Sequence, residues 1–195
     1  MKLILSKLGY DLIIVARREN LLEELKNDLK NTNVVIEKVD VSNPENCKEL
    51  FNKYQDVDIL VNNAGFGKFG EFDKIALNDE LSMINTNIVG VHTLTKLYLQ
   101  KMKEKNKGYI LNVASSAGLL PGGPLMATYY ATKSYVVSLT RAITEELKVS
   151  GSNVKISALC PGPVNTNFNN VANVRFSLKG LSTEYVAKYG IDNLL

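Results

Sequence analysis

Short aliphatic runs alternate with segments of helical periodicity along the whole chain. The run Leu12-Ile13-Ile14-Val15-Ala16 holds no polar residue, which is typical of a strand buried on both faces of a parallel sheet. Leucines then recur among Glu and Lys residues on one helix face, at Leu21, Leu22, Leu25 and Leu29. The same criteria predict later strands at 34–39, 58–61, 109–114 and 154–159, and later helices at 44–54, 78–105, 128–148 and from 182 to the end of the chain.

Strands that alternate with helices in this way predict an α/β fold with a doubly wound, Rossmann-like parallel sheet. Turn residues separate the elements: Ser42-Asn43-Pro44-Glu45 resembles a capping box, and Gly108 and Gly151 follow the two longest helices. No internal repeat, low-complexity tract or linker interrupts the pattern. The sequence therefore predicts one domain over residues 1–195.

The composition is that of an ordinary globular chain, and it excludes several classes of function. The 195 residues are 45% hydrophobic, which is enough for one buried core. The 23 Lys and Arg residues are mixed with 20 Asp and Glu residues, so no segregated basic face predicts nucleic-acid binding. No run approaches the roughly 18 apolar residues of a membrane span.

Cysteine and histidine are too scarce for a disulfide framework or a metal centre. The chain has two Cys and one His, and none of them stands at zinc-ligand spacing. The stretch that begins at Met1 has neither the apolar length nor the cleavage site of a signal peptide. A reduced, cytoplasmic setting is therefore expected.

Candidate ligand contacts stand at the ends of the first two predicted strands, where open α/β sheets bind their ligands. Arg17 and Arg18 follow the first strand; their two guanidiniums could hold the 2′-phosphate of an adenosine ribose, or they could belong to a solvated basic turn. Asp40 follows the second strand. Its carboxylate could accept a hydrogen bond from an adenine amino group, or it could cap the helix that begins near Pro44.

The third and last predicted strands end in segments that let a ligand approach the backbone. Asn62-Asn63-Ala64-Gly65 follows the strand at 58–61, and its small residues permit close approach, although Asn and Gly also form plain turns. After the last strand, Pro161-Gly162-Pro163-Val164-Asn165-Thr166 forms a rigid turn whose amides could meet a planar carboxamide.

The strongest chemical candidates follow the fourth predicted strand. Ser115 stands at its end, and Tyr129 and Lys133 are four residues apart, so they share one face of the next helix. A nearby ammonium favours the phenolate, which suits Tyr129 to general acid/base work. Tyr130 is the rival phenol, but Ser134 at the corresponding position carries no charge. Asn87 lies inside the predicted helix at 78–105, where Asn is usually unfavourable and calls for an explanation.

Taken together, these segments resemble the classical short-chain dehydrogenase/reductase family from about Gly9 to Thr166. The order and spacing of five segments carry the resemblance: Asn62-Asn63-Ala64-Gly65, Asn87 with Gly90, Ser115, Tyr129 with Lys133, and Pro161-Gly162. The resemblance implies an enzyme that transfers a hydride between NADP(H) and a small-molecule carbonyl or secondary alcohol.

The resemblance also implies the role of each site residue. Tyr129 exchanges a proton with the substrate oxygen, and Ser115 holds that oxygen. Lys133 lowers the pKa of Tyr129 and binds the nicotinamide ribose, while Asn87 supports a water chain. Cofactor contacts are expected at Arg17, Asp40, Asn63, Ala64, Gly65, Tyr129, Lys133, Pro161, Gly162, Val164 and Thr166. Arg17 favours NADP, and NAD is less expected because NAD enzymes of this fold usually place an acid there.

One departure from the family concerns the start and the end of the chain. The family begins with a strand, a Gly-rich phosphate turn and a helix, and only the second half of that helix is expected here, over Met1 to Leu8. Leu3-Ile4-Leu5 cannot be the missing strand, because a parallel crossover needs at least about ten residues before Leu12. At the other end, Leu195 falls inside an apparent helix, before the family's last strand.

The absent strand is central in the family's sheet, and its turn and helix bind the pyrophosphate. Poor dinucleotide binding by the chain as written is therefore expected, and the alternative function is a non-catalytic truncated module that no longer binds dinucleotide. An isomerase or dehydratase of related fold normally needs a larger substrate domain than the roughly 30 residues after Thr166 supply.

Two further expectations concern the substrate and the oligomer. The stretch from Asn167 to Leu181 is expected to cover the substrate with the apolar side chains of Phe168, Val171, Val174 and Phe176. The helices at 78–105 and 128–148 resemble those through which the family forms dimers and tetramers, so a homodimer or homotetramer is expected.

Overall fold

The computed structural model describes residues 1–29, 32–166, 168, 172 and 180–195. Five strands run parallel to one another wherever they pair. They are β1 (Leu12–Ala16), β2 (Val34–Lys38), β3 (Ile59–Asn62), β4 (Tyr109–Val113) and β5 (Lys155–Leu159). Each lies within one residue of a predicted strand.

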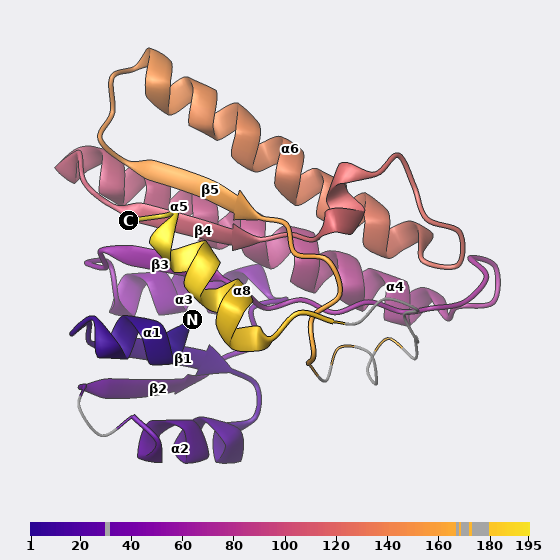
Figure 1. Ribbon diagram of the computed structural model, residues 1–195, viewed down its shortest axis with the longest axis horizontal. Coiled ribbons are helices and arrows are strands. Elements are labelled where there is room, and N and C mark those ends of the chain that lie inside the picture. Colours follow the sequence, from indigo (N-terminus) through magenta and orange to yellow (C-terminus); the bar gives the residue numbers. More distant parts are fainter. Residues whose placement is uncertain (30–31, 167, 169–171, 173–179) are drawn as a thin grey trace.

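Helices connect the strands and cover both faces of the sheets (Figure 1). They are α1 (Lys2–Lys7), α2 (Glu19–Asn27), α3 (Pro44–Lys53), α4 (Leu77–Ile84), the π-helix η1 (Asn85–Gly90), α5 (Val91–Lys105), the short 3₁₀ helix η2 (Ser116–Leu119), α6 (Ala127–Val149) and α8 (Thr183–Asp192). The α/β fold with parallel strands, predicted from the alternation of patterns, is confirmed. The first residues form a helix rather than a strand, as expected, and Gly9 follows it with a φ of +87°.

The strands form two separate sheets rather than one. β1 pairs with β2, whereas β3, β4 and β5 form a sheet in that order. Two hydrophobic cores nevertheless extend across both sheets. Val15 and Leu60 pack on one core, and Ile14 and Val61 pack on the other. The two sheets are thus parts of one layer, and the division between β1 and β3 falls where the family resemblance places a central strand.

Each core is built by the helices of its own face. On one face, α3, α5 and α6 contribute Leu50, Tyr98 and Leu147. On the other face, α1 and α8 contact each other and contribute Leu5 and Ile191. Cys47 of α3 is fully buried in the first of these cores, so the interpretation of this cysteine as a helix-surface residue is wrong.

The long helix predicted at 78–105 is interrupted by the π-helical turn η1. The chain comes very close to a neighbouring loop there, because a Cβ on Gly90 would lie 2.4 Å from the carbonyl oxygen of Val41. α5 ends at Lys105, as predicted, but the residue that terminates it is Asn106, with a left-handed backbone (φ 50°), rather than Gly108. The interruption places Asn87 in this π-helical turn.

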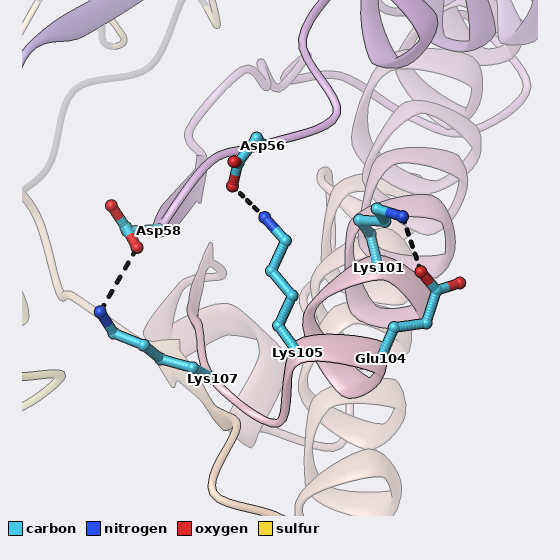
Figure 2. A network of polar contacts seen from close by, with 6 residues as sticks. All are labelled: Asp56, Asp58, Lys101, Glu104, Lys105 and Lys107. Carbon is cyan, nitrogen blue, oxygen red and sulfur yellow. Dashed lines mark hydrogen bonds and ion pairs between the residues drawn. The ribbon is translucent and has the colours of Figure 1, made fainter.

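The amino end of the β3–β4 pair carries exposed ion pairs (Figure 2). Lys105 pairs with Asp56, and Lys107 lies 3.8 Å from Asp58. These contacts join the end of α5 to the segment before β3, far along the strands from the residues that carry the candidate chemistry.

Two negative findings hold for the described part of the chain. None of its helices combines the length and apolar character that a membrane crossing requires. The same residues contain no group of three or more His, Cys, Asp or Glu side chains placed to bind a metal ion.

Candidate active site

Ser115, Tyr129 and Lys133 come together at the carboxyl end of β4. Ser115 follows this strand in an extended conformation, and Tyr129 stands in the first turn of α6. The hydroxyl of Ser115 acts on the phenol of Tyr129, whose pKa it lowers. The Nζ atom of Lys133 lies 5.9 Å from the centroid of the Tyr129 ring and donates to the carbonyl oxygen of Val113 at 2.9 Å. The predicted set of three therefore shares one location.

Local geometry explains why the three side chains meet. Tyr129 and Lys133 are one helical turn apart, so both project from the same face of α6. The short helix η2 packs tightly on that face, because a Cβ on Gly118 would lie 2.5 Å from the carbonyl oxygen of Lys133. Ser115 is the N-cap of η2, and its Oγ accepts a hydrogen bond from the backbone N–H of Ala117. Glycine at position 118 thus brings the serine segment against the tyrosine helix.

Burial sets the protonation of the site. Burial raises the pKa of Tyr129 above its usual value, and the hydroxyl of Ser115 opposes this rise. Burial also lowers the pKa of Lys133 to about 8. The expected lowering of the tyrosine pKa by Lys133 is not what the structure shows, because desolvation outweighs the attraction of an ammonium at this distance. Near neutral pH the phenol is protonated and the lysine is mostly charged.

Asn87 is fully buried and holds the loop after β3 in place. Its Oδ1 accepts from the backbone N–H of Phe66, and its Nδ2 donates to the carbonyl oxygen of Phe66 and to Oγ1 of Thr132. Thr132 in turn donates to the carbonyl oxygen of Tyr129. These contacts explain an Asn inside a helix. From the π-helical turn, the side chain of Asn87 links α6 to the loop that begins at Gly65.

A buried amide and hydroxyl network, which the sequence analysis did not assign to the site, lies directly beneath it. Asn62 donates to Thr95 and to Asn112, and Asn112 donates to Thr140. These four residues join β3, α5, β4 and α6. The available signal was the presence of Asn62 and Asn112 at the ends of two otherwise apolar strands, because a polar side chain in a buried run needs a partner.

The predicted cofactor residues after β3 are accessible. Asn63, Ala64 and Gly65 are exposed. A Cβ on Gly65 would lie 3.0 Å from Oδ1 of Asn87 and 3.3 Å from Nζ of Lys133. A side chain here would thus fill the space above the lysine, so glycine keeps the buried ammonium open from this side.

The predicted turn after β5 lies on the other side of the serine. The carbonyl oxygen of Pro161 accepts from the backbone N–H of Ser116 at 2.8 Å, and no other atom lies within 4 Å of a Cβ placed on Gly162. Val164 forms a β-bridge with Leu181. Thr166 is exposed and accepts a hydrogen bond from the N–H of Phe168. These residues border the same end of the sheet as Ser115.

Arg17 and Asp40 lie apart from the other candidates, at the end of the β1–β2 sheet. Arg17 is exposed. Burial alone would raise the pKa of Asp40. Hydrogen bonds from Ser42 and the charge of Arg17 together outweigh burial, so the pKa lies below its usual value. Asp40 does not cap α3, because that N-cap is Asn43, whose Oδ1 accepts from the N–H of Glu45. The capping interpretation of Asp40 is therefore wrong.

The residues present fit one end of a nicotinamide dinucleotide better than its middle. The Nζ atom of Lys133 uses one of its three donors on Val113, and it faces the glycine-lined end of β3. These groups suit a ribose hydroxyl and a carboxamide. A pyrophosphate is usually bound by a glycine-rich turn at the start of a helix. Among residues 1–29 and 32–166, no such turn and helix lie in the space between β1 and β3, so the described residues offer no contact of this kind.

Apolar side chains surround the phenol of Tyr129. Met126 and Phe66 belong to its cluster, and the ring of Phe168 lies 5.3 Å from the tyrosine ring, measured between centroids. This agrees with an apolar cover at Phe168. The other three side chains predicted for that cover, Val171, Val174 and Phe176, lie outside the described residues.

Comparison with known proteins identifies the family. The family model described as short chain dehydrogenase matches residues 3–175. The chain belongs to the short-chain dehydrogenase family. Curated members that are similar to this chain are named as oxidoreductases or dehydrogenases. The family is thus one of oxidoreductase enzymes.

Three relatives illustrate the similarity. The NADP-dependent 3-hydroxy acid dehydrogenase YdfG of Escherichia coli O6:H1 is 35% identical over 171 residues, which cover 84% of this chain and 66% of that protein. A short-chain dehydrogenase/reductase from Burkholderia phymatum, solved in complex with NAD, is 28% identical with a TM-score of 0.79; the match covers 97% of this chain and 71% of that one. A short-chain dehydrogenase from Sphingobium yanoikuyae, solved in complex with NADPH, has a TM-score of 0.88 over 97% of this chain and 78% of that one; at 24% identity it supports the fold alone.

The chain spans only part of such proteins. Its matched segment covers 60% of the length of one curated relative, from Bacillus subtilis, and 69% of another, from Rickettsia typhi.

Proposed function

We propose that this protein is an NADP-dependent oxidoreductase that interconverts a small-molecule carbonyl compound and the corresponding secondary alcohol. The observation that carries the proposal is a buried phenol, Tyr129, whose pKa the Ser115 hydroxyl lowers and whose ring has the Nζ atom of Lys133 5.9 Å from its centroid. Reduction of a ketone requires a proton donor at the oxygen on which negative charge develops. These three side chains form such a donor.

Each side chain has a distinct task in this mechanism. The hydroxyl of Ser115 holds the carbonyl oxygen, and the protonated phenol of Tyr129 donates its proton to it as the C–O bond acquires alkoxide character. The ammonium of Lys133 stabilises the resulting phenolate, which regains a proton from solvent. Oxidation of the alcohol follows the same steps in reverse. When bound, a nicotinamide dinucleotide supplies or accepts the hydride at the carbonyl carbon.

Asn87 supports the site from behind. It holds Thr132 and the backbone of Phe66, and so it fixes the relative positions of α6 and the loop at Gly65. We assign the ribose of the dinucleotide to Lys133, its nicotinamide to the Asn63-Ala64-Gly65 and Pro161–Thr166 segments, and its adenosine to Arg17 and Asp40. The exposed guanidinium of Arg17 favours the 2′-phosphate of NADP over the free hydroxyl of NAD.

The alternative function is a non-catalytic module that does not retain dinucleotide. It is favoured by one observation: β1 and β3 belong to different sheets, and the described residues offer no pyrophosphate contact between them. Calorimetry with NADPH distinguishes the two functions when the chain is compared with a version extended upstream by a strand, a Gly-rich turn and a helical turn. We expect the extended version to bind NADPH much more tightly, and equal affinities would defeat that expectation.

The extended protein is then the one to test for activity. Oxidation of NADPH, followed at 340 nm against a panel of ketones with apolar substituents, should reveal turnover of at least one substrate. The same panel with NADH should show weaker turnover, and replacement of Arg17 by Asp should reduce or reverse that difference. Absence of turnover with any carbonyl compound, despite tight NADPH binding, would favour the non-catalytic module.

We also propose that two copies associate through α4 and α6. A surface pocket of about 430 Å³ lies between these helices and is lined by Ile84, Ala131 and Tyr135 among others. Large apolar side chains are exposed beside it, at Phe72 and Leu77. Such a patch is typical of an interface. Light scattering should give the mass of a dimer or tetramer, and Phe72→Asp should shift it towards the monomer.

A further inference from the structure

Helix α6 carries both Tyr129 and Lys133, yet it begins without a side-chain cap. Its N-cap is Met126, which forms no capping hydrogen bond, and no residue of its first turn is acidic. Tyr129 is the third residue of this helix, so the position of the phenol depends directly on where the first turn lies. A helix end without partners for its N–H groups frays more readily than a capped one.

A buried carboxylate from another helix contacts this first turn. Glu80 of α4 is only 7% exposed, and its Oε1 accepts a hydrogen bond of 2.7 Å from Oγ1 of Thr128. Thr128 is the residue immediately before Tyr129. The two partners are 48 residues apart in sequence, so the contact joins two separate helices.

Glu80 lacks the partner that a buried acid usually has. It takes part in no ion pair among the residues that the structure describes. Asp79, its neighbour on α4, has such a partner: its side chain is 47% exposed and lies 3.0 Å from Lys68. A buried carboxylate needs some favourable interaction to offset its desolvation, and the positive end of a helix dipole supplies one.

We propose that Glu80 is a positioning residue of the active site. Its carboxylate provides the N-terminal partner that α6 lacks, and it thereby fixes the turn from which Tyr129 reaches Ser115. The role concerns the free protein, so it holds whichever substrate and dinucleotide are bound. Nothing in the sequence pattern marks Glu80, because the contact depends on the approach of two helices.

Hydrogen exchange of the backbone amides tests the first half of this proposal. In Glu80→Ala, the amides of residues 127–133 should exchange roughly fivefold faster or more than in the unmodified protein, as expected when a helix start loses its partner. The amides of residues 141–149, at the far end of the same helix, should be unchanged. Thr128→Val should have a similar effect, and the double variant should add little to either single one.

Asp79→Ala is the matched control, because it removes the same charge from the same helix at an exposed position. It should leave the exchange of residues 127–133 unchanged. Equal acceleration in the two variants would overturn the proposal, since a general loss of negative charge on α4 would then explain the effect. Unchanged exchange in Glu80→Ala would overturn it as well.

The position of Tyr129 itself is the second readout. In protein labelled with ¹³C-tyrosine, the Cζ resonance of Tyr129, assigned with Tyr129→Phe, senses the position of the phenol relative to the Ser115 hydroxyl. Glu80→Ala should shift this resonance in the same direction as Ser115→Ala, whereas Glu80→Gln, which keeps an acceptor oxygen, should shift it less. An unmoved resonance in Glu80→Ala would show that the acid serves the helix alone and not the site.

Both readouts are made on the protein without ligand, so they are independent of the proposed oxidoreductase activity. Absence of turnover with every carbonyl compound would refute that activity and leave the Glu80 result standing. If Glu80→Ala does not fold, Glu80→Gln and Thr128→Val carry the test, and normal exchange of residues 127–133 in both would overturn the proposal.

Discussion

Two lysines near opposite ends of the β3–β4 pair differ in the burial of their charges. Lys133, at the carboxyl end of β4, is 6% exposed, and burial lowers its pKa to about 8. Its Nζ atom donates to a backbone carbonyl oxygen of Val113. Lys105, at the amino end, pairs in solvent with Asp56, and its side chain is 37% exposed (Figure 2).

The two lysines differ in what their charges do for the stability of the protein. An exposed ion pair contributes little to stability, because water and salt screen it. A buried ammonium without a carboxylate destabilises the protein, and such a group persists at functional sites rather than at structural ones. The burial of Lys133 therefore supports the proposal that the active site lies at the carboxyl end of the sheet.

Replacement of the buried lysine should give the largest effect. Lys133→Met removes the ammonium that is proposed to stabilise the Tyr129 phenolate, so kcat of the upstream-extended protein with NADPH and a carbonyl substrate should fall by roughly a hundredfold or more. Because the burial of a charge is relieved, the melting temperature should not fall and is expected to rise. Lys105→Met, measured in parallel, should retain full turnover. Equal losses of activity in both variants would erase the distinction between the two ends.

Removal of the amide beneath the site should have the next largest effect. Asn112 is fully buried and contacts Asn62, Thr95 and Thr140. Asn112→Ala leaves these groups without partners and should lower the free energy of unfolding by about 2 to 3 kcal/mol, measured by urea denaturation. Asn193→Ala, at an exposed position, is the control and should change it by less than about 0.5 kcal/mol.

The pH dependence of stability follows from the depressed pKa of Lys133. Between about 8, its value in the folded state, and 10.5, its ordinary value, the unfolded chain binds more protons than the folded one. The free energy of unfolding therefore decreases as the pH falls through this window, because the buried lysine must then take up a proton in the folded state. From pH 8 to 9.5 the free energy of unfolding should rise by about 1 to 2 kcal/mol more in the unmodified protein than in Lys133→Met. Parallel curves for the two proteins would contradict the burial of this charge.

The smallest effect is expected at the exposed ion pair. Lys105→Met and Asp56→Asn should each change the free energy of unfolding by less than about 1 kcal/mol, and by still less at high salt. A double-mutant cycle measured by urea denaturation gives the coupling between them. A coupling well above that value would mean that the amino end is also held by strong electrostatics.

Most of the fold could be predicted from the sequence, because hydrophobic period decides strand and helix directly. All five strands lie within one residue of the predicted ranges, since each contains an aliphatic run, although Ile13 of β1 and Val35 of β2 are exposed. The ends of helices were less certain. The predicted end of α5 at Lys105 is confirmed, but the residue that terminates it is Asn106 rather than Gly108. Either residue can adopt the left-handed backbone that ends a helix, so spacing alone could not decide.

The candidate site was predictable only as far as its contacts are local. Tyr129 and Lys133 share a helix face by arithmetic, and Ser115 joins them through the tight approach at Gly118. Residues that act through distant contacts gave little signal. The contact between Glu80 and Thr128, and the network through Asn112, depend on how separate elements pack, which periodicity does not contain. The direction of the Tyr129 pKa shift was missed for the same reason, since burial comes from the whole fold.

The paired tyrosines at the start of α6 offer the most direct test of the central claim, that Tyr129 is the proton donor. Tyr129→Phe and Tyr130→Phe should be compared in the upstream-extended protein by NADPH oxidation and NADPH calorimetry. The account predicts that Tyr129→Phe lowers turnover by at least roughly a hundredfold with nearly unchanged NADPH affinity, while Tyr130→Phe stays active. Full activity in Tyr129→Phe, or equal loss in both variants, would contradict it.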